Sequence, residues 1–122
     1  MFQHVLSNDS SSTLFNSTFN EHYHSKHGAI QESTHVFINE GLRHFSKQCI
    51  SILEVGFGTG LNVFLTYLNV NNIRITYHSV DTTPIPFDMI KSLNYPEKLK
   101  VDSNVFDLIH TIDWNVDYQV SP

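Results

Sequence analysis

The most regular pattern of apolar and polar residues lies in the middle of the chain, where an apolar run is followed by three alternate glycines. Residues 50–55 are mainly β-branched and aliphatic, which is typical of a strand buried on both faces of a parallel sheet. After the glycines, apolar residues recur at the spacing of one helical face, at Leu61, Phe64, Leu65 and Leu68. The pattern therefore predicts a strand, a glycine turn and a helix in this order.

The three glycines of the turn, Gly56, Gly58 and Gly60, can adopt positive φ and let a ligand approach the backbone closely. No lysine follows Gly60, which excludes a phosphate-binding P-loop, and Leu61 occupies the place of the third glycine in a dinucleotide fingerprint. Glu54 lies two residues before the first glycine. With this acid, the turn resembles the first motif of Rossmann-like S-adenosylmethionine-dependent methyltransferases.

A second strand is predicted by the alternation of apolar and polar residues over positions 73–78. Val80 leads from it into Asp81, near the place where a dinucleotide fold carries an acid roughly 20 residues after the glycine turn. A carboxylate at this position can accept hydrogen bonds from both hydroxyls of a cofactor ribose. The alternative role for Asp81 is to cap a helix predicted over residues 84–93.

The N-terminal elements are predicted from turn residues and helical spacing. Residues 1–13 are polar and rich in turn-forming residues, and we expect them to be disordered. A short strand or hairpin is predicted over residues 14–21. A helix capped by Ser33 or Thr34 follows, with an apolar face formed by Ile38, Leu42 and Phe45. Residues 14–49 then form an N-terminal extension that leads to the first core strand.

Two helices are predicted in the C-terminal part. The first begins at Pro86, turns Ile90 and Leu93 inward, and ends at residues 94–96. The second runs from residue 103 or 104 to about residue 111, with an apolar face formed by Val105, Ile109 and Ile112.

Two segments of the chain resemble the MnmC-like tRNA 5-methylaminomethyl-2-thiouridine methyltransferases. The first, residues 19–38, reads Phe-Asn-Glu-His-Tyr-His-Ser-Lys-His-Gly-Ala-Ile-Gln-Glu-Ser-Thr-His-Val-Phe-Ile, and the second, residues 54–62, reads Glu-Val-Gly-Phe-Gly-Thr-Gly-Leu-Asn. Residues 77–86 are similar more loosely, because the family usually carries glutamate in place of Asp81. The resemblance covers about residues 17–99 and implies an α/β fold of the Rossmann-like methyltransferase class.

The family's enzymes are about twice as long as this chain, as a full doubly wound sheet requires. Residues 50–122 are therefore expected to form the truncated first half of a Rossmann-like domain, with its first two core strands and their helices. The Asp-Ala-Phe-x-Pro stretch that carries the family's assisting acid has no counterpart in the sequence. We expect no catalytic residue in this chain, and we expect the isolated chain to be inactive.

The resemblance implies that the cofactor is S-adenosylmethionine, held by the glycine motif and by the acid after the second strand. The cofactor-binding residues are then Glu54, Gly56, Phe57, Gly58, Thr59, Gly60 and Asp81. The resemblance also places the first segment over the cofactor pocket. Tyr23 and His24 become candidates for contact with the substrate, and Glu32 is expected to pair with the ammonium group of the cofactor.

Three histidines, His22, His24 and His27, lie within six residues and raise the alternative of a metal site. Their H-x-H-x-x-H spacing matches no standard ligand pattern, so we expect a polar loop or a substrate-side role and no metal. The single cysteine, Cys49, cannot form an internal disulfide and is expected to be a small buried residue.

Composition limits the partners and the compartment. An apolar content of 40% over 122 residues suits one ordinary globular domain. A net charge of −5, with scattered basic residues, argues against strong binding of tRNA phosphates by this chain alone. The sequence shows neither a leader peptide nor an apolar run of the roughly 20 residues that a membrane span needs, so we expect a cytoplasmic protein.

The leading hypothesis is methyl transfer from S-adenosylmethionine to the aminomethyl group of a modified tRNA wobble uridine, with tRNA bound by the intact enzyme. The alternatives are an inactive fragment or small binding module without turnover, and a nicotinamide-dependent oxidoreductase. A partner oxidoreductase of the same modification pathway, as a domain or a separate protein, is a further expectation. Two core strands cannot bury both faces of a parallel sheet, so the fragment is also expected to self-associate.

Overall fold

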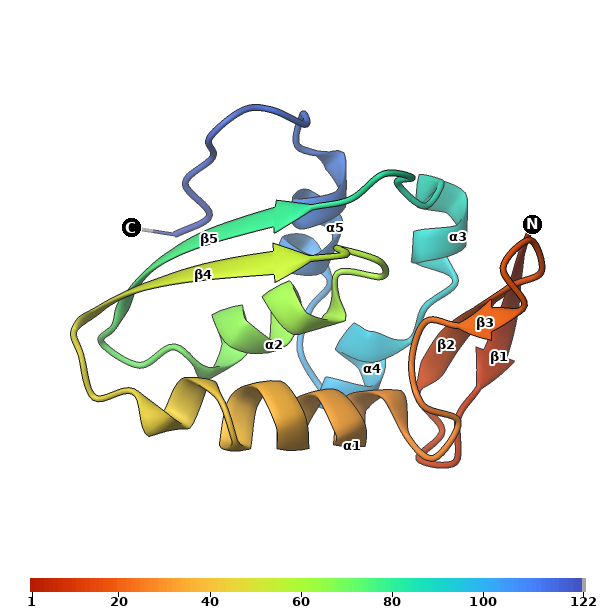
Figure 1. Ribbon diagram of the computed structural model, residues 1–122, viewed down its shortest axis with the longest axis horizontal. Helices are drawn as coiled ribbons and strands as arrows, with labels where there is room; N and C mark the ends of the chain where they lie inside the picture. Colours follow the sequence, from red (N-terminus) through yellow and green to blue (C-terminus); the bar gives the residue numbers. More distant parts are fainter. Residues whose placement is uncertain (122) are drawn as a thin grey trace.

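A computed structural model describes residues 1–121 of the chain as a mixed α/β protein with two separate sheets (Figure 1). Strands β1 (Phe2–Leu6), β2 (Ser12–Asn16) and β3 (Glu21–His22) form an antiparallel sheet in the order β1-β2-β3. Strands β4 (Cys49–Val55) and β5 (Arg74–Val80) form a parallel pair. The predictions of the two core strands and of a hairpin near residue 14 are confirmed.

The helices occupy three parts of the chain. Between the two sheets, α1 (Ala29–Ser33) continues as a π-helix, η1 (Thr34–Asn39), and then as a 3-10 turn, η2 (Leu42–His44). Helix α2 (Leu61–Asn69) connects β4 to β5. After β5 come the short helices α3 (Phe87–Lys91), α4 (Tyr95–Leu99) and α5 (Asn104–Thr111).

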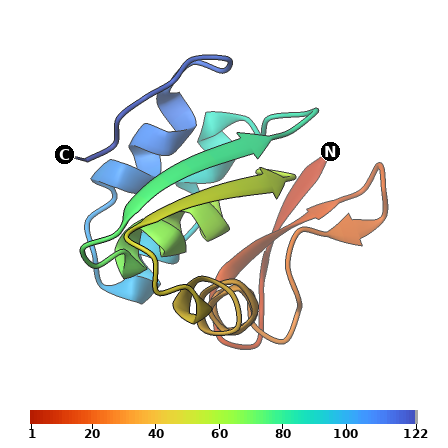
Figure 2. The ribbon, with the colours of Figure 1, turned by 60° about the vertical axis from the view of Figure 1, so that its left-hand side comes forward.

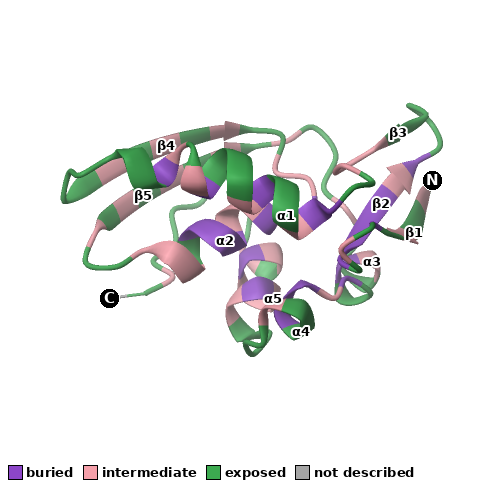
Figure 3. Cartoon of the chain, turned by 90° about the horizontal axis from the view of Figure 1, so that it is seen from below, coloured by how far each residue is buried: buried purple, intermediate pink, exposed green. Residues whose placement is uncertain are grey.

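The parallel pair is covered on one face only. Helices α2, α4 and α5 lie on the same side of β4 and β5 (Figures 1 and 3). Along both strands, exposed residues alternate with half-buried ones, and Leu53 is 71% exposed, Val55 83% and Val80 50%. The expectation that the first core strand is buried on both faces is therefore wrong, because no second helical layer is found within residues 1–121. Cys49 lies on the uncovered face and is exposed, so its expected burial is wrong for the same reason.

The hydrophobic core lies between the covered face of the parallel pair and the helices. The predicted inward residues of α2 are confirmed, since Leu61, Phe64 and Leu65 are at most 2% exposed, while Leu68 is half-buried. The core also contains Leu14, Ala29, Ile38, Leu42, Ile90, Leu93, Tyr95, Phe106 and Ile109. The amphipathic pattern therefore located most of the side chains that hold the helices against the sheet.

The N-terminal residues 1–13 are ordered as strand β1, a turn and the start of β2, so the expectation of disorder is wrong. The polar residues of the turn bind the start of helix α1. Ser7 Oγ accepts a hydrogen bond from the Ala29 amide at 3.0 Å, and Asp9 Oδ2 accepts one from the Gln31 amide at 3.0 Å. These amides have no partner inside their own helix, so a distant loop caps α1. Figure 2 shows the hairpin beside this helix.

Helix α1 begins at Ala29 after Gly28, earlier than the predicted cap at Ser33 or Thr34. No local side chain caps it, because the loop around Asp9 supplies the acceptors instead. The predicted apolar face of this helix is confirmed at Ile38 and Leu42, which lie in the core, but Phe45 is 56% exposed because the helical segment ends before it.

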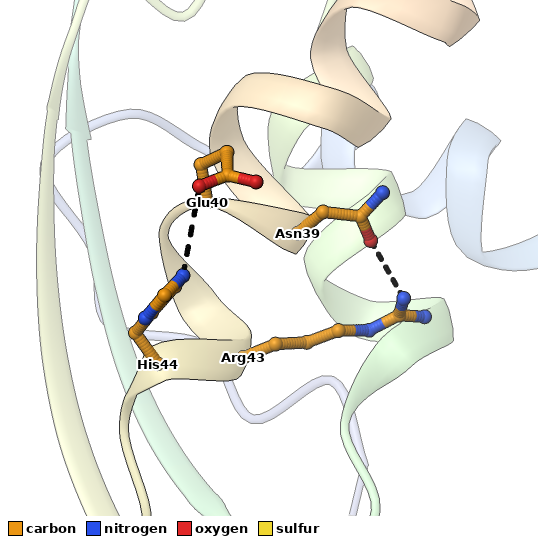
Figure 4. A network of polar contacts seen from close by, with 4 residues as sticks. All are labelled: Asn39, Glu40, Arg43 and His44. Carbon is orange, nitrogen blue, oxygen red and sulfur yellow. Dashed lines mark hydrogen bonds and ion pairs between the residues drawn. The ribbon is translucent and has the colours of Figure 1, made fainter.

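Beyond helix α1, polar contacts on the surface join the end of η1 to η2 (Figure 4), and a further one reaches the end of α2. Arg43 donates to Asn39 Oδ1 at 2.6 Å and to Asn69 Oδ1 at 3.1 Å, while His44 Nε2 lies 3.7 Å from Glu40 Oε2. The side chains of His44 and Glu40 are both more than 60% exposed. Solvent screening makes such contacts worth little to stability.

The C-terminal helices agree with the sequence pattern except in one place. Ile90 and Leu93 are buried, and α5 spans the predicted range with Ile109 in the core, which confirms both helices. The predicted end at residues 94–96 starts a new helix instead, because Pro96 fits the first turn of a helix as well as it ends one. Within residues 1–121, no helix has the length and apolar character needed to cross a membrane.

Candidate functional site

The glycine turn connects the end of β4 to the start of α2, as predicted. Gly56, Gly58 and Gly60 have φ values of 92°, 55° and 72°, which confirms the need for residues without a Cβ at these positions. The Gly56 amide donates to the Val80 carbonyl at 2.8 Å and extends the parallel pair by one residue. The turn therefore leaves the sheet at the carboxyl ends of two parallel strands, where α/β proteins bind ligands.

The three glycines have different surroundings. A Cβ added at Gly56 would meet nothing within 4 Å. At Gly58 it would lie 3.0 Å from the ring of Tyr23, and at Gly60 it would lie 2.7 Å from Nε2 of His110. Only Gly56 therefore faces open space, whereas the other two glycines make room for side chains of the protein itself.

Asp81 lies beside the glycine turn, as predicted from the sequence. Its Oδ2 accepts a hydrogen bond from the Gly58 amide at 2.9 Å, and its Oδ1 accepts one from the Thr83 amide at 2.9 Å. The alternative role as a cap is wrong, because the residue before α3 is Pro86 and no side chain caps that helix. Asp81 instead joins the end of β5 to the middle of the turn.

Glu54 points into the protein rather than toward the open side of the turn. Its carboxylate accepts hydrogen bonds from Ser79 Oγ at 2.7 Å and from Asn62 Nδ2 at 3.2 Å. Burial raises the pKa of Glu54, although these hydrogen bonds and one from Tyr77 act in the opposite direction. Burial, with the nearby Glu54 carboxylate, also raises the pKa of Tyr77. Glu54 thus joins β4, β5 and α2, and its expected contact with a cofactor finds no support in this geometry.

Thr59 is 1% exposed and lies at the centre of a group of polar contacts. His24 Nε2 lies 2.7 Å from its Oγ1, and the Tyr95 hydroxyl donates to the same oxygen at 3.4 Å. His110 Nε2 lies 3.0 Å from its carbonyl oxygen. Internal partners therefore enclose the Thr59 side chain, and the expected part of Thr59 in holding a cofactor stays a prediction.

His24 is also turned inward, toward Thr59. Burial lowers the pKa of His24 to about 4, although the charge of Glu32 raises it, so its imidazole is neutral at neutral pH. The half-buried imidazole is thus engaged with an internal hydroxyl. The expected substrate-side role of His24 stays a prediction.

Tyr23 and Glu32 retain partly accessible positions. Tyr23 is half-buried with its ring against Gly58, and burial is the main cause that raises the pKa of its phenol. Glu32 is exposed, and its Oε2 accepts a hydrogen bond from the Ser25 amide at 2.8 Å. The structure therefore brings Tyr23 to the glycine turn, whereas Glu32 orders the segment that follows Tyr23.

Aromatic side chains from α5 and the segment after it line the other side of the turn. The ring centroids of Phe57 lie 5.2 Å from those of His110 and 5.7 Å from those of Trp114. A cavity of about 20 Å³ lies among them, lined by Phe57, Gly58, Pro84, Ile85, Ile109, His110 and Trp114. Sequence reasoning missed His110 and Trp114, since only the presence of one tryptophan distinguished that segment.

The histidine-rich segment forms no metal centre in the described part of the chain. Residues 1–121 contain no group of three or more histidine, cysteine, aspartate or glutamate side chains that could hold a metal ion. The ring of His22 packs against Phe15 with centroids 4.9 Å apart, while His24 bonds to Thr59. His22 and His24 therefore contact different residues and do not share a site.

No family model matches the chain. Curated relatives do. The chain is 34% identical over 92 residues to a tRNA 5-methylaminomethyl-2-thiouridine biosynthesis bifunctional protein MnmC from Psychrobacter cryohalolentis, which covers 62% of this chain and 13% of the relative. It is 31% identical over 99 residues to the MnmC protein of Legionella pneumophila, covering 70% of this chain and 15% of that protein. The chain thus spans about one seventh of the length of these relatives.

A solved structure, that of MNMC2 from Aquifex aeolicus, is similar in fold and in sequence. It aligns with a TM-score of 0.54 and 28% identity over 75% of this chain and 36% of that chain. The similarities in sequence and in structure thus point to the same family, and the chain belongs to an MnmC-like family.

Proposed function

We propose that the chain is part of an S-adenosylmethionine-dependent methyltransferase that acts on the aminomethyl group of a modified wobble uridine in tRNA. The names of the MnmC relatives support a role in the biosynthesis of this nucleoside. In this proposal, residues 50–122 form the first half of a Rossmann-like methyltransferase domain, and residues 14–49 form an extension over the cofactor site. The tRNA and an oxidoreductase partner are proposed for the intact enzyme.

The observation that carries the proposal is the open space at Gly56 next to the Asp81 carboxylate. Gly56 has nothing within 4 Å of the position of a Cβ, so a ligand can approach this backbone without displacing protein atoms. Asp81 is fixed at the turn by the amides of Gly58 and Thr83. Each carboxylate oxygen can accept a second hydrogen bond, so both remain able to bind the hydroxyls of a ribose.

Bound at this position, S-adenosylmethionine supplies an electrophilic methyl group for direct displacement by an amine. The residues of this chain then act by binding and orientation. Gly56 provides bare backbone, Asp81 accepts from ribose hydroxyls, and Phe57 offers an apolar surface beside the turn. The small cavity next to Phe57 holds little more than one water, so the exposed side chain of Trp114 must move before a purine ring enters there.

A small binding module without turnover is the second candidate function. The uncovered face of β4 and β5 exposes Leu53, Val55 and Val80, and such apolar faces mark contacts with other protein. No residue of this chain is assigned as the base that deprotonates the amine. Binding without turnover is therefore the outcome that the isolated chain would show if it keeps the cofactor site alone.

Isothermal titration of the chain with S-adenosylmethionine and, separately, with NAD tests the proposal. We expect binding of S-adenosylmethionine and none of NAD, because Leu61 is buried where a dinucleotide turn needs its third glycine. Replacement Asp81→Asn should weaken binding about tenfold through the loss of charge-assisted hydrogen bonds. His44→Gln, at an exposed site on η2, is the matched control. Heat with NAD but not with S-adenosylmethionine would overturn the proposal.

A further inference from the structure

We propose that His110 and His24 are positioning residues that hold Thr59 from two sides and keep the glycine turn in the conformation that leaves Gly56 open. Neither imidazole contacts the open space at Gly56, since His110 packs on Gly60 and His24 on Thr59. The inference rests on the proposed function only in assigning Gly56 to the cofactor. The ordering of the turn can be measured without any ligand.

His110 holds the main chain of the turn from helix α5. Its Nε2 lies 3.0 Å from the Thr59 carbonyl oxygen, and its Nδ1 lies 2.7 Å from the carbonyl oxygen of Phe106 one helical turn earlier. Both neighbours are acceptors. A proton on Nε2, in the neutral or the charged ring, is therefore required for a hydrogen bond to Thr59.

The same ring explains the third glycine of the motif. A Cβ at Gly60 would lie 2.7 Å from Nε2 and 2.8 Å from Cε1 of His110, and 3.0 Å from the Phe57 ring. Any side chain at this position would push the imidazole away from the Thr59 carbonyl. Gly60 is thus assigned to the packing of His110, and its expected contact with the cofactor stays a prediction.

His24 holds the side chain of the same threonine from the segment after β3. Its Nε2 lies 2.7 Å from Thr59 Oγ1, and the Tyr95 hydroxyl donates to Oγ1 from the opposite element, α4. Because Tyr95 supplies a proton to Oγ1, the threonine hydroxyl can donate its own proton to His24 Nε2. Three parts of the chain distant in sequence therefore meet at one hydroxyl.

The turn needs such support because its glycines are free to leave their positive φ values. Gly58 and Gly60 flank Thr59, and glycine loses more conformational freedom on ordering than any other residue. The contacts to Thr59 act on both its carbonyl and its hydroxyl. They offset this entropy and fix the direction in which the preceding Gly56 backbone faces.

Amide hydrogen exchange of the whole chain tests the inference directly. Exchange at Gly58 and Gly60 is compared with that at Ile75 in β5, which reports on the stability of the sheet. In His110→Ala, we expect the ratio of turn to strand exchange to rise about tenfold, and in His24→Ala by a smaller factor. His110→Gln, whose amide can donate to the Thr59 carbonyl, should restore part of the protection, and His44→Ala should change nothing.

Two results would overturn the inference. One is an unchanged ratio of turn to strand exchange in both alanine variants. The other is an imidazole ¹⁵N spectrum of the unaltered chain in which His110 carries its proton on Nδ1 alone, a result that needs no variant to fold. If S-adenosylmethionine binds, its affinity should fall in His110→Ala and recover in part in His110→Gln. If it does not bind, the proposed function fails, while the exchange ratio still decides the role of the two histidines.

Discussion

Two loops of the molecule place their polar groups at the start of a helix, and they do so by different means. The loop between β1 and β2 uses the side chains of Ser7, Asp9 and Ser11 to receive the first amides of α1. The glycine turn before α2 uses backbone in left-handed conformation and leaves a bare surface at Gly56. The acceptors of the first loop are occupied by amides of the protein, whereas one side of the second loop is open to a ligand.

The largest effect should separate the packed glycine from the open one. Gly60→Val combines a β-branched residue at φ 72° with a contact of 2.7 Å to His110, so we expect a loss of about 4 kcal/mol of unfolding free energy. Gly56→Ala has only the backbone strain at φ 92° and should cost about 1 kcal/mol. Urea unfolding monitored by circular dichroism measures both. Equal losses would contradict the distinction between the two glycines.

The next effect is a pH dependence that originates at the turn. Burial lowers the pKa of His24 to about 4 from the ordinary histidine value of 6.5, so the folded chain binds fewer protons than the unfolded chain between these values. Stability from this group therefore falls as the pH drops from about 6.5 to 4, by about 3 kcal/mol in total. Burial also lowers the pKa of His110, which acts in the same direction.

Other groups titrate in the same range, so the contribution of His24 is measured as a difference. Burial raises the pKa of Glu54, which opposes the trend. The unfolding free energy of the unaltered chain and of His24→Gln should be determined at pH 7 and pH 4.5, with His44→Gln as a control on an exposed histidine. The fall on acidification should be smaller in His24→Gln than in the other two proteins. An identical fall in all three would show that His24 is not neutral in the fold.

These effects bear on what the sequence could and could not predict. The strand, glycine turn and helix over residues 50–69 follow from local periodicity, and each was predicted from residues that lie next to one another. The order of residues 1–13 could not be predicted in this way, because Asp9 also binds the distant amide of Gln31. A polar run that is ordered by a distant helix has the same composition as a disordered one.

The candidate site was predictable to the same extent. Asp81 was placed correctly because it ends a strand parallel to the one before the turn, and register brings the two ends together. The internal partners of the Glu54 and Thr59 side chains could not be predicted, because the direction of a side chain at the edge of a sheet depends on what packs beside it. His110 lies on α5 and Trp114 in the segment after it, far along the chain from the turn, and no local pattern linked them to the glycines.

The β1–β2 loop should show a moderate effect that is independent of ligand. Asp9→Ala removes the acceptor for the amides of Ser11 and Gln31, and we expect a loss of about 2 kcal/mol. Asp9→Asn retains one acceptor oxygen and should lose about half as much. Burial raises the pKa of Asp9, but the hydrogen bonds from Ser11, Gln31 and Ser7 outweigh it and lower this pKa below its ordinary value. The stability that Asp9 contributes is therefore lost only as the pH falls below the ordinary range of aspartate.

Chemical denaturation at pH 7 measures this loss, and exchange of the first amides of α1 locates it. The amides of Ala29 to Gln31 should lose protection in Asp9→Ala, while the glycine turn keeps its own. Loss of protection both at the start of α1 and at the glycine turn would mean that the two loops are coupled. It would contradict the view that the β1–β2 loop and the glycine turn are ordered independently.

The smallest effect on stability is expected on the uncovered face of the parallel pair. Val55 is 83% exposed and Leu53 71%, so the double replacement Leu53→Thr with Val55→Thr should change the unfolding free energy by less than about 0.5 kcal/mol. Its effect should appear in association instead. If the face joins two copies of the chain, as expected for a sheet covered on one side, sedimentation velocity should show an oligomer that the double variant shifts toward monomer. The variant Arg74→Thr on the same face, which leaves the apolar residues in place, should keep the oligomer. If the unaltered chain and the double variant are both monomers at about 100 μM, water covers this face. Three exposed aliphatic side chains are then too few to hold a second copy of the chain.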